Sequence, residues 1–233
     1  MKREVVRSRN FVSEAAEFIL QQARNSLAER DTFRIALSGG NTPRPVYHEL
    51  TRIGRDLPWD RMFFTFGDER CVPPDDEQSN FRMAREALFI PANVPNNSVA
   101  RIEGEIEPKI AAQKYEEKLK LMAAQRAEPI YRHDLILLGM GNDGHTASLF
   151  PETEASRETQ RWVMENFVPK SNTWRITFTF PLINKARQIC FLANADKNTS
   201  LLDKVLGGDT NYPAARVEPT NGDLTWILAQ NET

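Results

Sequence analysis

The sequence predicts an α/β protein with a mostly parallel central sheet flanked by helices. Two observations lead to this fold class. Short apolar runs, typical of buried strands, alternate along the chain with segments whose apolar residues recur at helical spacing. Several of these runs end directly in glycine and polar residues, as strands do at the ligand-binding edge of an open α/β sheet.

The first half of the chain is expected to hold three helices and two strands. Apolar residues recur at helical spacing from Phe11 to Leu27, and two short, largely apolar runs follow further on. Pro43 suits the first turn of a helix, and Ser79 offers an N-cap for a later one. The expected elements are a helix over 11–30, a strand over 33–37, a helix over 43–50, a strand over 62–66 and a helix over 81–89.

The second half continues the alternation. A helix is expected over 106–124, with Ile110, Tyr115, Leu119 and Met122 on roughly one side. The remaining expected elements are a strand over 134–138, β-rich segments over 162–164 and 175–180, a strand over 188–192, a helix over 197–206 and a strand over 224–228. The Pro-, Gly- and Asn-rich loops over 90–105 and 207–221 are not linkers, because the alternation resumes after each.

Composition narrows the classes of function. The 233 residues are 40% hydrophobic and 27% charged, and we expect one domain over residues 1–233. A net charge of −2 disfavours nucleic acid and anionic membranes as partners, and no run approaches the ~18 apolar residues of a membrane span. Cys71 and Cys190 are expected to be reduced thiols of a cytoplasmic protein. No cluster has zinc-ligand spacing, so no metal is expected.

The first turn that could carry chemistry follows the strand over 33–37. Its residues are Ser38, Gly39, Gly40, Asn41, Thr42 and Pro43. The glycines let the backbone approach a ligand, the polar side chains can donate hydrogen bonds, and the start of the next helix favours an anion. The turn lacks the Gly-Lys-Ser/Thr of a P-loop. A tight turn with a helix cap and no ligand is the alternative.

The second turn, over 67–70, follows the phenylalanine-rich strand. Asp68 could position a hydroxyl group, and Arg70 could bind a phosphate through its planar guanidinium. Charged residues at the end of a strand are commonly only solvated, which is the alternative.

The third turn, over 139–148, places His145 close to Asp143 after an apolar strand. A histidine beside an aspartate suits acid–base catalysis, although a lone loop histidine is more often structural. The glycines also match a dinucleotide-binding fingerprint, with Glu165 about 20 residues on. That alternative requires a full helix after the third glycine, and Pro151 comes too early for one. His48 and His133 are expected to be structural.

These turns belong to longer blocks that resemble the 6-phosphogluconolactonase family. The blocks occur in order over 36–43, 66–73, 79–82, 138–151, 175–178 and 213–216. The block Asp-Gly-His-Thr-Ala-Ser-Leu-Phe-Pro over 143–151 is highly specific, whereas the Ser-Gly-Gly block is shared with sugar-phosphate relatives. The resemblance implies a glucosamine-6-phosphate-deaminase-like fold, which is a modified Rossmann-like arrangement. It also implies hydrolysis of 6-phospho-D-glucono-1,5-lactone in the oxidative pentose phosphate pathway, with no cofactor.

The resemblance assigns roles to particular residues. It places the reaction centre at His145 and Asp143, with His145 as the general base. It places the substrate and its phosphate at Ser38, Gly39, Gly40, Asn41, Thr42, Asp68, Arg70, Arg175 and Lys197. The family commonly shows Gly-x-x-Lys-Ala before the late helix, whereas this chain has Asn-Ala-Asp-Lys-Asn over 194–198.

Three other functions stay open on the sequence. They are a glucosamine-6-phosphate deaminase or related isomerase, with Asp68 as a base, a non-catalytic sugar-phosphate-binding protein, and a nicotinamide-dependent oxidoreductase. The Thr-Ala-Ser-Leu-Phe-Pro continuation favours the lactonase. The expected partner is a small sugar-phosphate lactone, and we expect a monomer or a weak homo-oligomer.

Overall fold

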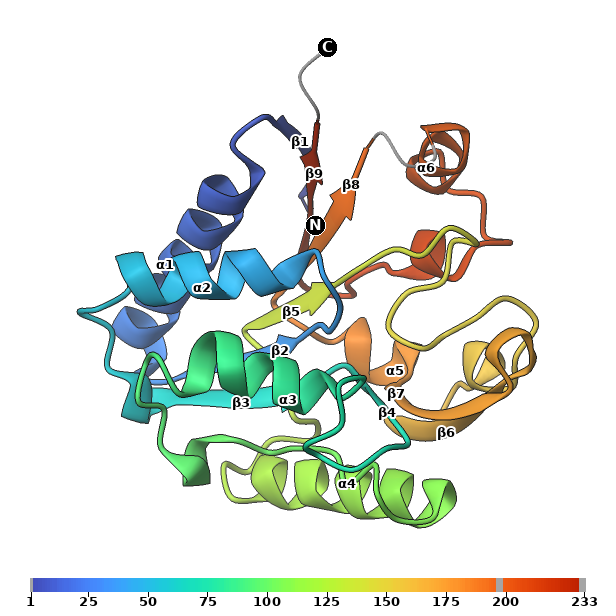
Figure 1. Cartoon of the computed structure of the whole chain (residues 1–233), viewed down its shortest axis with the longest axis horizontal. Coiled ribbons are helices and arrows are strands. Elements are labelled where there is room, and N and C mark those ends of the chain that lie inside the picture. Colours follow the sequence, from blue (N-terminus) through green and yellow to red (C-terminus); the bar gives the residue numbers. More distant parts are fainter. Residues whose placement is uncertain (1, 196–198, 231–233) are drawn as a thin grey trace.

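In the part of the chain that the computed structural model describes, residues 2–195 and 199–230, six strands form a parallel central sheet (Figure 1). Its order is β1-β9-β8-β5-β2-β3, and every neighbouring pair is parallel. The bounds are β1 (Arg3–Ser8), β2 (Phe33–Leu37), β3 (Met62–Phe66), β5 (Leu135–Leu138), β8 (Gln188–Asn194) and β9 (Asp223–Ala229). The predicted fold class is confirmed.

A second, antiparallel sheet lies beside the first. It has the order β4-β7-β6, with β4 (Asp68–Arg70), β6 (Val163–Val168) and β7 (Thr173–Phe178). The sequence indicated β structure near β6 and β7 but assigned Asp68 and Arg70 to a turn. Both in fact belong to a strand, and Arg70 pairs directly with Arg175 of β7.

Helices surround the sheets (Figure 1). They are α1 (Phe11–Arg30), α2 (Pro43–Ile53), α3 (Asn80–Ala84), α4 (Pro108–Ala124), α5 (Phe180–Ile183) and α6 (Thr199–Leu206). Helices α1 and α2 pack together, and α4 packs on β6 and β7. Ser79 Oγ accepts a hydrogen bond from Arg82 N at 3.1 Å, which confirms the expected N-cap.

The buried face of α4 differs from the expected one. Tyr115 and Leu119 are buried as expected, but Ile110 is 47% exposed. Ala111 and Ala112 take its place against the rest of the protein. The small alanine side chains allow close packing, so the buried face of α4 includes Ala111 and Ala112 in place of Ile110.

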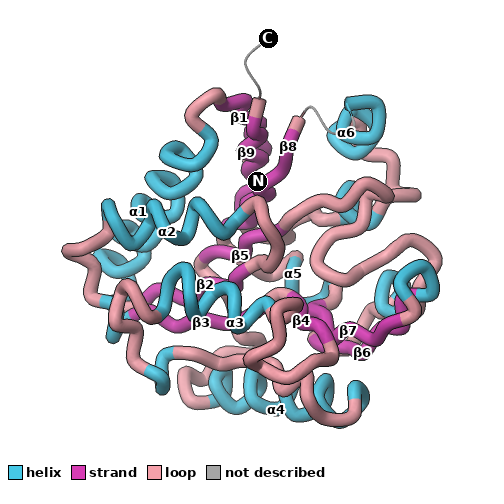
Figure 2. Tube along the Cα trace, viewed as in Figure 1, coloured by secondary structure: helices cyan, strands magenta, loops and turns pink. Residues whose placement is uncertain are grey.

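The strand order creates a crevice at the centre of the sheet. From β2 the chain moves outward to β3, whereas from β5 it moves in the opposite direction to β8. Strands β2 and β5 are neighbours, and ligands of open α/β sheets bind at the carboxyl ends of strands where the order reverses. Ser38 directly follows β2 and Gly139 directly follows β5. Between β5 and β6 the chain is mostly loop (Figure 2).

Candidate active site

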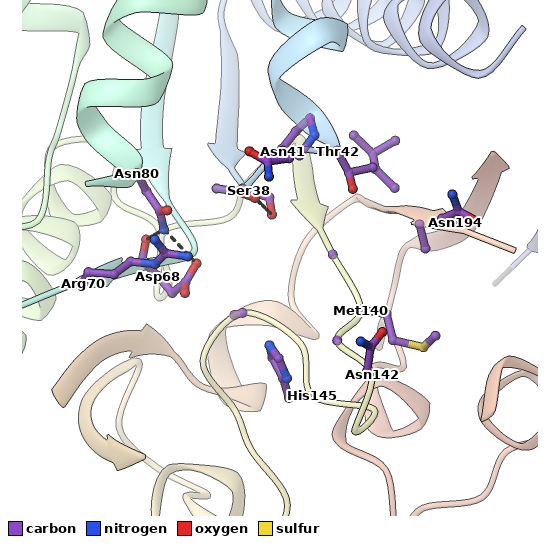
Figure 3. Close-up of a pocket in the computed structure, with 18 residues that line it drawn as sticks. Ser38, Asn41, Thr42, Asp68, Arg70, Asn80, Met140, Asn142, His145 and Asn194 are labelled. Carbon is purple, nitrogen blue, oxygen red and sulfur yellow. Dashed lines mark hydrogen bonds between the residues drawn. The ribbon is translucent and has the colours of Figure 1, made fainter. Parts of the chain in front are cut away.

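A cavity of about 230 Å³ lies at this crevice (Figure 3). Segments that follow β2, β3 and β5, together with the end of β8, contribute to its wall, so the sheet topology places the cavity. Its lining residues are Ser38, Gly39, Gly40, Asn41, Thr42, Pro43, Asp68, Arg70, Asn80, Gly139, Met140, Gly141, Asn142, His145, Ala147, Leu192, Ala193 and Asn194.

The turn after β2 is held by a buried tyrosine. Tyr47 of α2 accepts a hydrogen bond from Ser38 N at 3.0 Å and donates one to Ser38 O at 2.8 Å. Burial raises the pKa of Tyr47 far above its usual value, so the hydroxyl keeps its proton and its donor role. Gly40 has φ +93°, a conformation that favours glycine.

Gly39 is required because Asn80 lies against its backbone. A Cβ atom added at Gly39 would lie 1.8 Å from Asn80 Oδ1. The turn then leads into α2, where Pro43 occupies the first turn. Pro43 and Pro45 carry no N–H, so the donors at this end are the backbone N–H groups of residues 39–42 and of Arg44, and N–H groups at the start of a helix favour anions. This end of the cavity can therefore bind a negatively charged group.

A buried carboxylate forms another part of the wall. Asp68, 9% exposed, accepts hydrogen bonds from Ser148 Oγ at 2.7 Å and Asn80 Nδ2 at 3.3 Å. Asn80 is fixed by Glu69, whose Oε1 accepts from Asn80 N at 2.7 Å. Figure 3 shows Asp68, Asn80 and Arg70 together on one side of the pocket. These contacts hold Asp68 in one orientation toward the cavity.

Two arginines lie side by side on the small sheet. Residues directly opposite each other in an antiparallel pair project to the same face, so Arg175 lies beside Arg70. Arg70 lines the cavity and donates to Gln78 O at 2.6 Å. Burial and the charge of Arg70 lower the pKa of Arg175. A bound anion would relieve this repulsion.

The turn after β5 holds His145 against Asp143. Nδ1 of His145 lies 2.5 Å from Asp143 Oδ1, which also accepts from His145 N at 3.2 Å. The imidazole stacks on Phe150 with ring centroids 4.0 Å apart. Partial burial opposes ionisation of Asp143, but the hydrogen bond and charge of His145 outweigh it and lower the pKa of Asp143. A carboxylate at Nδ1 favours the tautomer whose unprotonated nitrogen is Nε2.

Glycines let this turn close around the ring. A Cβ atom on Gly141 would lie 2.1 Å from His145 Cε1, and one on Gly144 would lie 2.6 Å from Tyr212 Cδ1. Gly144 also has φ +76°. No long helix follows Gly144 in the described chain before β6, in line with the argument against dinucleotide binding.

The cavity brings together most of the residues expected at a site. Ser38, Gly39, Gly40, Asn41, Thr42, Asp68, Arg70 and His145 all line it. Asp143 and Arg175 are not lining residues, but Asp143 contacts His145 and Arg175 pairs with Arg70. Lys197 lies outside the described residues. The sequence missed Asn80, Met140, Asn142 and Asn194 as lining residues. For Asn194, its place two residues after the strand predicted over 188–192 was a usable signal.

Other sequence predictions can also be compared with the structure. His133 is fully buried, with Nε2 2.9 Å from Thr65 Oγ1, and burial lowers its pKa to about 3, as suits a structural residue. Cys71 and Cys190 are free thiols. Among the described residues, no three His, Cys, Asp or Glu side chains gather as metal ligands would. Nor does any helix in those residues have the length and apolar character needed to cross a bilayer.

Comparison with known proteins places the chain among sugar-phosphate enzymes. Residues 7–226 match the family model described as glucosamine-6-phosphate isomerases/6-phosphogluconolactonase. The 6-phosphogluconolactonase of Synechocystis sp. is 39% identical over 209 residues, which are 88% of this chain and 85% of that protein. The Haemophilus influenzae 6-phosphogluconolactonase is 33% identical over 220 residues, covering 92% and 90%. The crystal structure of Thermotoga maritima 6-phosphogluconolactonase aligns with a TM-score of 0.86 at 30% identity, covering 98% of this chain and all of that one.

Proposed function

The chain belongs to the family of glucosamine-6-phosphate isomerases and 6-phosphogluconolactonases, and we propose that it hydrolyses 6-phospho-D-glucono-1,5-lactone to 6-phosphogluconate, a step of the oxidative pentose phosphate pathway. The observation that carries this proposal is His145. Its Nδ1 is bound by Asp143, and the ring lines a cavity that also holds Arg70 and the start of α2. A base and an anion site in one cavity suit a phosphorylated ester.

In the proposed reaction, Nε2 of His145 takes a proton from a water molecule as the water oxygen attacks the lactone carbonyl carbon. The bond between that carbon and the ring oxygen then breaks, and the imidazolium returns its proton to the departing ring oxygen. Asp143 holds the ring and stabilises its transient positive charge. A lactone is an activated ester, so this reaction needs no covalent nucleophile.

The phosphate is proposed to lie at the other end of the cavity. Residues 39–42 and Arg44 of α2 offer backbone N–H groups, whereas Pro43 and Pro45 have none, and Arg70 offers a planar fork of donors. Arg175 supports Arg70 by adding positive charge beside it. Binding of the remote phosphate would hold the lactone carbonyl next to His145, so that binding energy is used to orient the reacting groups.

The activity assay separates the lactonase from its relatives. We expect the protein to accelerate opening of the lactone above the spontaneous rate, and to release no ammonia from glucosamine 6-phosphate. Acid release is followed in progress curves with and without protein. Ammonia release without lactone hydrolysis would instead establish a deaminase, with Asp68 as a candidate base. Saturable binding of 6-phosphogluconate without turnover would establish a non-catalytic sugar-phosphate-binding protein.

Replacing Arg70 by alanine tests the phosphate assignment. We expect KM for the lactone and Kd for 6-phosphogluconate to rise at least about tenfold, because a charge-assisted hydrogen bond is lost. Arg70→Lys should restore only part of the affinity, since lysine keeps the charge but not the planar fork. Calorimetric titration with 6-phosphogluconate gives the affinities.

A matched control for this test is Arg52→Ala, because Arg52 is exposed, lies outside the cavity and pairs with Glu49. Thermal unfolding checks that loss of the Arg70–Gln78 contact leaves the fold intact. Unchanged affinity in a folded Arg70→Ala protein would show that the phosphate binds elsewhere.

A further inference from the structure

A second cavity lies at the amino ends of the same strands, on the edge of the sheet opposite the candidate active site. Arg34 is the second residue of β2, Asp134 directly precedes β5, and Arg187 directly precedes β8. All three line a cavity of about 360 Å³. In a parallel sheet the amino and carboxyl ends of the strands lie at opposite edges, so this cavity is separate from the one that holds His145.

Arginines dominate the wall of this second cavity. Five guanidinium groups and two carboxylates line it. We call it the arginine cavity, and its arginines are Arg30, Arg34, Arg126, Arg132 and Arg187. The chain as a whole carries a net charge of −2, so this concentration of positive charge is local and does not reflect a generally basic surface.

Both carboxylates of the arginine cavity are already used. Asp134 lies 3.0 Å from Arg30 Nε and 3.3 Å from Arg187 Nε, and its other oxygen accepts from Arg34 N at 2.8 Å. Glu128 pairs with Arg34 Nη1 at 2.6 Å. Two buried or partly buried carboxylates thus serve three arginines, and Arg30 Nη1 also pairs with Glu29, which lies outside the cavity lining.

Within the described part of the chain, the other two arginines hydrogen-bond to neutral groups. Arg132 donates to Lys185 O at 3.0 Å and to Asn221 O, and Arg126 donates to Thr32 Oγ1 at 3.1 Å. Burial, followed by the charges of Arg187 and Arg30, lowers the pKa of Arg132. The cavity therefore holds arginine charge that its two carboxylates do not balance, and the two carbonyl contacts of Arg132 already hold that side chain in position.

We propose that the arginine cavity binds a small phosphate-bearing anion with two or more negative charges, at a site separate from the candidate active site. Guanidinium forks from several directions match the oxygens of tetrahedral phosphate groups. The cavity is concave and recessed at the strand ends, which suits a small molecule better than the surface of a macromolecule. A cavity of about 360 Å³ has room for a diphosphate group.

Calorimetric titration with pyrophosphate tests the proposal on the full-length protein. We expect Arg132→Ala to weaken binding at the arginine cavity at least about tenfold, and the more exposed Arg126→Ala to weaken it about threefold. Arg70→Ala should abolish only the pyrophosphate binding that takes place in the catalytic cavity. Arg52→Ala serves as a control for the loss of a surface arginine. Amide chemical shifts should move at residues 126–134 and 185–188.

Arg126→Ala keeps the test valid if Arg132→Ala fails to fold, because Arg126 is exposed, hydrogen-bonds to Thr32 Oγ1 and lies over the ring of Phe63. Lactone hydrolysis by folded Arg126→Ala and Arg132→Ala should match the parent, so this inference can fail while the proposed function stands. The proposal would be overturned if Arg70→Ala abolished pyrophosphate binding while the folded Arg126→Ala and Arg132→Ala proteins bound it as the parent does. It would also be overturned if the Arg70→Ala protein, in which the arginine cavity is intact, bound pyrophosphate with a Kd weaker than millimolar.

Discussion

Replacing His145 by alanine is expected to lower kcat for lactone hydrolysis by at least about a hundredfold, the usual scale for loss of a general base. KM should change little, because the proposed phosphate contacts lie on other elements. The imidazole is the group whose Nδ1 is bound by Asp143 and whose ring reaches the cavity. Initial rates, corrected for spontaneous opening of the lactone, give both constants for the variant and the parent.

The matched control is His48→Ala. His48 is exposed on α2 and does not line the cavity, so this variant should turn over at the parent rate. Asp143→Asn should also lower kcat, since an amide cannot stabilise the imidazolium as a carboxylate does. A folded His145→Ala protein with near-normal turnover would exclude His145 as the base and remove the main support for the proposed mechanism.

Local sequence patterns predicted the helices and strands whose buried residues recur with regular spacing. The bounds of α1, β2 and β3 agree with the expected ranges, because helical spacing and short apolar runs directly reflect burial. Strand β1 was missed, since it is an edge strand whose mostly exposed, charged residues lack an apolar run. Strand β4 consists of three charged residues, Asp68, Glu69 and Arg70, and is stabilised by pairing with a distant segment.

The candidate site was predictable in its parts but not in its assembly. Each turn has a local signal, such as the glycines before Asn41 or the aspartate near His145. Their meeting depends on strand order, which no local pattern encodes. Asn80 illustrates the limit of local reasoning. It follows a helix-capping serine in the sequence, yet its side chain lies against Gly39 and Asp68, about forty and twelve residues away along the chain.

Gly141→Ala is expected to lower kcat about a hundredfold without removing any functional group. The added Cβ atom would lie 2.1 Å from His145 Cε1 and 2.2 Å from Nδ1, closer than any real contact. The ring must move, but Phe150 stacks on it and Asp143 holds Nδ1. A displacement of about 1 Å at a catalytic group can lower the rate by about a hundredfold. Kinetic constants for the variant measure the loss of turnover, and the chemical shifts of the His145 ring protons report the displacement of the ring.

Gly67→Ala provides the matched control, because it adds the same methyl group just after β3, another strand of the same sheet. The nearest atom to a Cβ at Gly67 is Leu37 O at 3.7 Å, an ordinary contact, and Gly67 does not line the cavity. This variant should keep the parent kcat and KM. If Gly141→Ala retained parent turnover with unshifted His145 signals, the close packing of this turn against the imidazole would not govern catalysis. If the ring signals moved while kcat stayed the same, the base would have to be a group other than His145.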